Sequence, residues 1–232
     1  MRVSLTRMGG FMASLLGTLA LPGRLRRMGA IMSAAREYVH HEHVEWLRPP
    51  AGGWTADDLD KLPNLPPHTE LIDGSLILMS PQTFFHMAVL RLLENAMLAQ
   101  VPEGFAVIRE MTTKLTARDR PEPDLMVVSE DALTGPGQTW YEPESVLLAV
   151  EIVSADSIDR DREVKPHKYA RAGIPHFWRV EESDGLPVVH VYELDPAARS
   201  YSFMGIHHKQ LKLERPFPLD VDLSTLSPRP TP

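Results

Sequence analysis

A nearly unbroken apolar run, SVLLAVEIVS at residues 145–154, is the feature that most constrains the fold of this chain. Runs of this kind are typical of a central strand that other elements cover on both faces of its sheet. The run contains one acid, Glu151. A buried carboxylate without a partner costs several kcal/mol or gives up its charge. The run therefore predicts a central strand in which Glu151 meets either a bound cation or a buried lysine or arginine.

Periodic patterns in the flanking sequence predict the other elements. Residues 83–100 repeat apolar side chains at helical spacing, and a second helix is expected at about 161–172, ended by Gly173. The Asp73-Gly74 pair predicts the turn of a tight hairpin. Further strands are expected in FAVIREMTTKLT, PDLMVV and HFWRVE and in a closing hairpin of VVHVYEL and SYSFMGI, with a loop at 135–143. Because helices and strands mix without strict alternation, the sequence predicts an α/β fold with a mixed central β-sheet flanked by helices.

Composition narrows the chemistry that this chain can use. With 232 residues, 43% of them hydrophobic and 24% charged, the chain resembles an ordinary soluble globular protein with one good-sized domain. It has no cysteine, which excludes disulfides and thiolate metal sites and leaves carboxylates and ten histidines as metal ligands. The net charge of -7 argues weakly against non-specific coating of nucleic acid. A metal site made of carboxylates is itself acidic, so this argument is not decisive.

Local composition predicts four parts in the chain. Residues 1–31 carry five arginines and no acid and form a separate N-terminal extension. Residues 32–54 are expected to hold a short helix and a linker. The main domain is expected at residues 55–222, and a Pro-rich tail follows at 223–232. No segment reaches the roughly 18 apolar residues of a membrane span, so we expect a cytoplasmic protein without a membrane partner.

The first part, 1–31, is open to three interpretations. It can be a secretory signal, a short membrane-surface helix, or upstream sequence preceding a true start at Met28 or Met32. The HHEH run at 40–43 does not put its histidines on one helical face, so we expect a surface cluster there and not a metal site.

The central stretch holds the chemistry. Pro123 keeps Asp124 extended at the mouth of the PDLMVV strand, and if that strand neighbours the one carrying Glu151, the two acids converge beside a backbone carbonyl. These are the hard oxygen ligands that Mg²⁺ takes. With Lys165 nearby to orient or deprotonate water, the set suits hydrolysis of a phosphodiester. Taken singly, Asp124 is also a common turn residue after proline.

Two further residues are ambiguous on the sequence alone. Glu70 sits in the first strand of the Asp73-Gly74 hairpin, where an exposed edge-strand acid is the expected interpretation. His86 lies near the start of the first helix, where a lone histidine is usually structural, and it is a second-rank site candidate. Tyr169 and Trp178 are expected to pack in the core.

The segments EPDLMVV, LLAVEIVS and DRDREVKPHKYARAGIPHFWRVE, with ELIDGSLILMSP and His86 before them, resemble the bacterial Uma-two (Uma2) family of restriction endonucleases in the PD-(D/E)XK nuclease superfamily. The resemblance covers roughly residues 55–222. It implies a restriction-endonuclease-like core with Asp124 and Glu151 as metal ligands and Glu70 as an additional acid.

The resemblance also bears on the lysine. The superfamily's lysine lies two residues after the glutamate, where this chain has Val153, and the family's replacement corresponds to Lys165. Pro166 disfavours helical geometry in the residue before it, so we expect Lys165 at the helix entrance. Lys168 and Asp161 are second-rank candidates.

These features together predict a Mg²⁺-dependent DNA endonuclease, with Mn²⁺ as a substitute. A homodimer is expected, because one site per chain cuts two strands most easily as a pair. The alternative is a nuclease-fold module that binds nucleic acid or a protein partner with little or no cleavage. A weaker alternative is a metal-dependent hydrolase acting on another phosphoester.

Overall fold

The computed structural model describes residues 48–226. The predictions for residues 1–31, for the HHEH run and the short helix before residue 48, and for the end of the Pro-rich tail lie outside this range. No helix among the described residues is long and apolar enough to cross a membrane.

A six-stranded mixed sheet forms the centre of the fold, in the order β10-β9-β8-β7-β5-β3. Its strands are β3 (Phe105–Arg109), β5 (Leu125–Ser129), β7 (Val146–Ile152), β8 (His176–Ser183), β9 (Leu186–Asp195) and β10 (Ser200–His207). Only the β7–β8 pair is parallel, and the other neighbours in this sheet run antiparallel. The apolar run forms β7, which has neighbours on both sides. The predicted α/β class with a mixed central sheet is confirmed.

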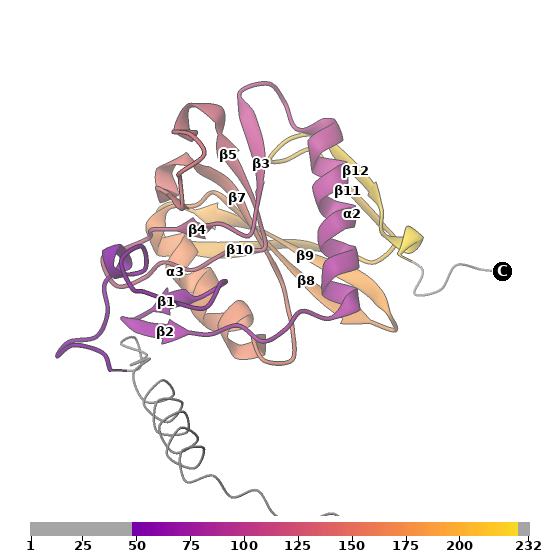
Figure 1. Ribbon diagram of the computed structural model, residues 1–232. Coiled ribbons are helices and arrows are strands. Elements are labelled where there is room, and N and C mark those ends of the chain that lie inside the picture. Colours follow the sequence, from indigo (N-terminus) through magenta and orange to yellow (C-terminus); the bar gives the residue numbers. More distant parts are fainter. Residues whose placement is uncertain (1–47, 227–232) are drawn as a thin grey trace, which may run out of the picture. The chain divides into compact units, whose positions relative to one another are not determined.

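Two helices cover the two faces of this sheet. Helix α2 (Phe84–Gln100) begins where the Thr83 side chain accepts a hydrogen bond from the His86 backbone N–H. Helix α3 (Lys165–Ala172) ends at Gly173, whose φ of 91° is the left-handed geometry that a helix C-cap favours. Figure 1 shows α2 on the same side of the sheet as β11 and β12, with α3 on the opposite side.

The start of α3 differs from the prediction. A single π-helical turn, η5 (Arg160–Val164), leads directly into α3, and Lys165 has φ −63° and ψ −45°, which is helical. Pro166 was expected to disfavour this geometry. The wider π turn before it and the place of Pro166 in the first turn of α3 explain how the proline is tolerated.

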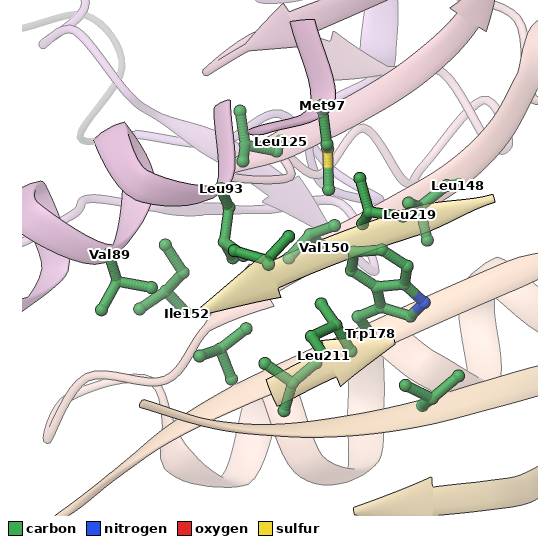
Figure 2. Close-up of a cluster of buried hydrophobic side chains, with 14 of the residues drawn as sticks. Val89, Leu93, Met97, Leu125, Leu148, Val150, Ile152, Trp178, Leu211 and Leu219 are labelled. Carbon is green, nitrogen blue, oxygen red and sulfur yellow. The ribbon is translucent and has the colours of Figure 1, made fainter. Parts of the chain in front are cut away.

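The alternation of side chains along the strands creates a core on each face. On the α2 face, Leu93 and Met97 pack against residues of β5, β7, β8 and β9 that include Leu148, Val150 and Trp178 (Figure 2). On the α3 face, Tyr169, Ile174 and Phe177 pack against the alternate residues of β5 and β7. Glu151 is one residue from Val150 and so points to the α3 face.

Three small sheets surround the central one. The predicted hairpin at Asp73-Gly74 is β1 (Glu70–Ile72) with β2 (Ser75–Ile77). Strand β4 (Thr112–Thr113) pairs with β6 (Trp140–Tyr141), so the predicted loop at 135–143 contains a short strand. The hairpin of β11 (Gln210–Leu213) and β12 (Leu219–Asp222) closes the α2 face and was not predicted. Short 3₁₀ turns complete the chain: Ala56–Asp58, Glu130–Ala132, Pro143–Ser145 and Leu223–Thr225.

Candidate active site

Strand register brings Asp124 and Glu151 together. Leu125 pairs with Val150 in the antiparallel β5–β7 ladder, so the next residues outward, Asp124 and Glu151, face each other. The Asp124 Oδ2 accepts a hydrogen bond of 2.6 Å from the backbone N–H of Ile152. The two strands are therefore neighbours, which is the condition on which the predicted convergence of these acids depended.

The Lys165 ammonium lies among three carboxylates. Its Nζ is 2.7 Å from Glu70 Oε1, 3.0 Å from Glu151 Oε2 and 3.4 Å from Asp161 Oδ1. Each of the four side chains is at most 3% exposed. The cation that Glu151 requires inside its apolar strand is thus a lysine from the following helix.

The position of Glu70 contradicts the expectation of an exposed edge-strand acid. Glu70 is fully buried, and its Oε1 also accepts a hydrogen bond of 2.8 Å from the Glu122 backbone N–H. Strand β1 is bridged at Leu71 to Arg120, so the segment leading to β5 covers it. This long-range contact has no trace in the local sequence around Glu70, which is why the exposure was predicted wrongly.

The carboxylates around Lys165 keep its ammonium charged, and they outnumber it. Burial alone lowers the pKa of Lys165, but the surrounding carboxylates outweigh it and raise that pKa well above its ordinary value. Burial raises the pKa of Glu151 well above its ordinary value, opposed by Lys165 and reinforced by Asp161 and Asp124. Burial likewise raises the pKa of Asp161. One ammonium therefore serves more carboxylates than it can neutralise.

Tyr169 was predicted to pack, and it does so against Phe177 with ring centroids 5.9 Å apart. Sequence reasoning missed its second contact, in which the Tyr169 hydroxyl donates a 2.6 Å hydrogen bond to Glu151 Oε1. Asp161, Lys165 and Tyr169 recur every four residues. This spacing puts them on one side of the helical segment and was the signal available in the sequence.

The other two second-rank candidates, His86 and Lys168, do not lie on this side of the helical segment, and only His86 comes close to the predicted acids. The His86 Nε2 lies 2.9 Å from Asp124 Oδ1, so the structure brings His86 to the Asp124 carboxylate. Lys168 pairs with Asp73 at 2.6 Å and with Asp119 at 2.7 Å, which ties α3 to the β1–β2 hairpin. Lys168 is therefore not brought to the acid cluster.

A pair formed by a histidine and a glutamate, His68 and Glu122, lies beside the site and was not predicted. The His68 Nδ1 lies 2.5 Å from Glu122 Oε1, and this hydrogen bond raises the pKa of His68. His68 and Glu110 have positive φ values of 57° and 50°, a strained geometry that often occurs near functional sites. The PEPD sequence places Glu122 two residues before Asp124, and this proximity was the only local signal.

The donor chemistry of the cluster fits a hard divalent cation. Carboxylates of Glu70, Glu151 and Asp161 gather around one ammonium, and Asp124 lies opposite Glu151 on the neighbouring strand. Glu70 Oε2 and Asp161 Oδ1 are buried without a hydrogen-bond donor among the described residues. Within residues 48–226, however, no three histidine or acidic side chains surround a common point at metal-ligand geometry. Asp124 and Glu151 are the two carboxylates that face each other across adjacent strands, and their role as metal ligands stays a prediction.

Comparisons with known proteins agree with this architecture. A crystal structure described as "a putative nuclease belonging to DUF820", from Anabaena variabilis, superposes with a TM-score of 0.52 at 17% sequence identity, covering 67% of this chain and 83% of that chain. At this identity the likeness concerns the fold, which is that of the predicted nuclease-like core. A comparison with curated proteins gives no match.

The family comparison rests on sequence. The model of the Uma2 family, described as "Putative restriction endonuclease", matches residues 56–226. The match includes Glu70, His86, Asp124, Glu151 and Lys165, and it spans well over half of the sequence. The chain therefore belongs to the Uma2 family of restriction-endonuclease-type proteins.

Proposed function

We propose that this protein is a metal-dependent endonuclease that hydrolyses phosphodiester bonds in DNA at the Asp124–Glu151 site. The observation that carries the proposal is the pairing of these two carboxylates across adjacent strands, with the Lys165 ammonium 3.0 Å from Glu151. Packing gives no reason for a buried acid near the end of β7, whereas phosphodiester hydrolysis needs carboxylates and a positive group together.

The residues divide the work according to their contacts. Asp124 is held by the Ile152 backbone N–H and by His86, so one carboxylate is fixed at the strand end where it is 15% exposed. Tyr169 and Lys165 hold the two oxygens of Glu151. Asp124 and Glu151 would hold Mg²⁺, which supplies a Lewis acid and an activated water when bound. Lys165 offers positive charge to the phosphate oxygens in the transition state.

Plasmid nicking tests this proposal. Supercoiled DNA is incubated with the full chain and Mg²⁺ or Mn²⁺, and we expect Asp124→Asn and Glu151→Gln to reduce cleavage by at least about 100-fold. Glu163→Gln is the matched control, because Glu163 is an exposed acid of the π turn η5, just before α3. Wild-type rates in both site variants would show that the assignment is wrong.

Metal binding gives a readout that is independent of cleavage. Calorimetric titration with Mg²⁺ or Mn²⁺ is expected to give weaker binding for Asp124→Asn than for wild type, while Glu163→Gln binds normally. Thermal melting of each variant identifies any loss caused by unfolding.

One observation favours the alternative of a module that binds without cutting. Lys165 already occupies the centre of the carboxylate cluster, and Glu70, Glu151, Asp161 and Lys165 are almost completely buried. A binder of this kind would retain DNA affinity, show no nicking with either metal, and bind Mg²⁺ equally well before and after Asp124→Asn. The homodimer also remains a prediction, for which sedimentation of the full chain is the measurement.

A further inference from the structure

A small cavity lies between α3 and strands β8, β9 and β10. Its volume is about 160 Å³. Its ionisable lining residues are Arg162, His167 and Arg179, and Phe177, Tyr192 and Tyr201 form an aromatic wall. No acid lines the cavity among the described residues. It is thus a basic and aromatic hollow in a chain of net negative charge.

This cavity is adjacent to the acid cluster on the same face of the sheet. Arg179 of β8 pairs in register with Glu151 of β7, and adjacent strands lie about 4.8 Å apart. Along the helical segment, Arg162 directly follows Asp161 and Pro166 directly follows Lys165. The side of α3 that faces the cavity therefore neighbours the side that faces the carboxylates.

The two arginines share a single acid. Arg162 donates to Glu181 through Nε at 3.0 Å and Nη2 at 2.5 Å. The Arg179 Nε is 2.7 Å from Glu181 Oε1, but it lacks the alignment of a hydrogen bond and has no acceptor among residues 48–226. Two guanidinium groups thus share one carboxylate at ion-pair distance, with Asp159 acting on Arg162 from further away, and the Arg179 Nε is left as an unsatisfied donor.

The Arg179 side chain is also fixed in orientation. Its guanidinium carbon lies 5.7 Å from the centroid of the Tyr192 ring, and the side chain is 16% exposed. A planar guanidinium held in this way matches the oxygens of a phosphate, since its donors form a rigid fork. Arg162 is 44% exposed and can move toward an incoming anion.

We propose that this cavity binds a backbone phosphate of the nucleic-acid strand, next to the phosphate at the Asp124–Glu151 site. Arg162 and Arg179 hold the phosphate oxygens, the aromatic wall contacts the adjoining sugar, and Glu181 occupies the arginines in the free protein. The inference rests on the proposed function for its ligand, a nucleic acid, but it concerns binding and not cleavage.

Binding without metal tests this site. The full chain is titrated into a short fluorescein-labelled DNA duplex, and into the corresponding single strand, with EDTA present and salt varied from about 50 to 200 mM. We expect Arg162→Ala and Arg179→Ala each to weaken binding at least about fivefold and to reduce the slope of log K against log salt by about 1. Arg171→Ala is the matched control, because Arg171 is an exposed arginine of α3 outside the cavity.

Glu181→Gln gives a result of opposite sign. Glutamine keeps an acceptor for Arg162 but removes the negative charge that competes with a phosphate, so DNA affinity is expected to rise about two- to fivefold. A role for Glu181 in folding alone would leave affinity equal or lower. Melting curves verify that each variant is folded at the assay temperature.

The outcomes separate this inference from the nuclease proposal. Unchanged affinity and salt slope in both arginine variants, weaker binding by Glu181→Gln, or no wild-type binding to either DNA would overturn the phosphate site. Arginine-dependent binding by a protein that never nicks plasmid would support the site and refute the nuclease. Normal nicking by a protein whose DNA binding does not depend on the two arginines would support the nuclease and refute the phosphate site.

Discussion

Removing the Lys165 charge should destabilise the fold in a way that depends on pH. We consider Lys165→Met, which keeps most of the side-chain volume and deletes the ammonium. The substitution leaves Glu70, Glu151 and Asp161, at 2.7, 3.0 and 3.4 Å in the wild type, without their cation. The protein then retains buried carboxylates that repel one another.

The magnitude follows from these distances and from the burial. At about 3 Å and an effective dielectric constant of about 20, each contact has a Coulomb energy of about 5 kcal/mol before the desolvation that offsets much of it. Removing one partner of a buried ion pair costs about 3–5 kcal/mol in measured cases. For a domain of this size that loss corresponds to a fall in Tm of about 6–20 °C.

The pH dependence has a definite sign. The Glu151 pKa is already raised by burial, and Lys165 is the group that opposes this rise, so the variant's folded state binds a proton more strongly still. When the folded-state pKa of a glutamate is above its unfolded value of about 4.3, protonation stabilises the folded state. This stabilisation is complete below the unfolded pKa and is lost as pH rises through the folded pKa. We therefore expect the penalty of Lys165→Met to be smaller at about pH 5 than at about pH 8, by up to about 1.4 kcal/mol per pH unit for each proton.

Urea denaturation at both pH values measures this effect. Lys168→Met is the matched control, since Lys168 lies one turn further along the same helix and pairs with the exposed Asp73 and with Asp119, which is 11% exposed. We expect a smaller loss, of about 1–2 kcal/mol, because Lys168 remains partly exposed and has two partners in place of three. The reasoning fails if Lys165→Met is within about 1 kcal/mol of wild type at pH 8, or if its penalty grows on acidification.

Three further substitutions test separate parts of the structure by chemical denaturation. Tyr169→Phe removes the 2.6 Å hydrogen bond to Glu151 and should cost about 1–3 kcal/mol; an unchanged midpoint would mean that water replaces the hydroxyl. Gly173→Ala forces alanine into a φ of 91° and should cost about 1 kcal/mol, whereas a gain would show that the C-cap relaxes. Leu93→Ala opens a cavity in the α2-face core and should cost about 2–5 kcal/mol, with a value below 1 indicating local collapse.

The sequence predicted those features that depend on short-range patterns. The apolar run of β7, the hairpin at Asp73-Gly74 and the helix of residues 84–100 each carry their periodicity or turn residues locally. The β11–β12 hairpin was missed, because its strands are only four residues long and the connecting residues 214–218 hold no tight-turn pair such as the Asp73-Gly74 of the β1–β2 hairpin. Short strands have too few residues to display an alternation.

For the site, the sequence indicated which residues come together more reliably than it indicated their burial and their contacts. The need of Glu151 for a cation was evident from its apolar neighbours, and Lys165 satisfies that need directly. The burial of Glu70 depends on a segment about fifty residues further along the chain, so no local pattern could reveal it. The helical geometry of Lys165 depends on a π turn, which a proline rule based on ordinary helices does not consider.

The single parallel pair in the sheet has a consequence for how this chain can vary in length. Parallel strands need a long connection, and between β7 and β8 this connection is the segment that carries Asp161, Lys165 and Tyr169. Residues added within the helical segment, between Asp161 and Lys165, would change the helical phase of Asp161 against Lys165 and Tyr169 and so separate the groups around Glu151. The β8–β9 turn at Asp184-Gly185 carries none of them, so inserted loops or fused domains belong there.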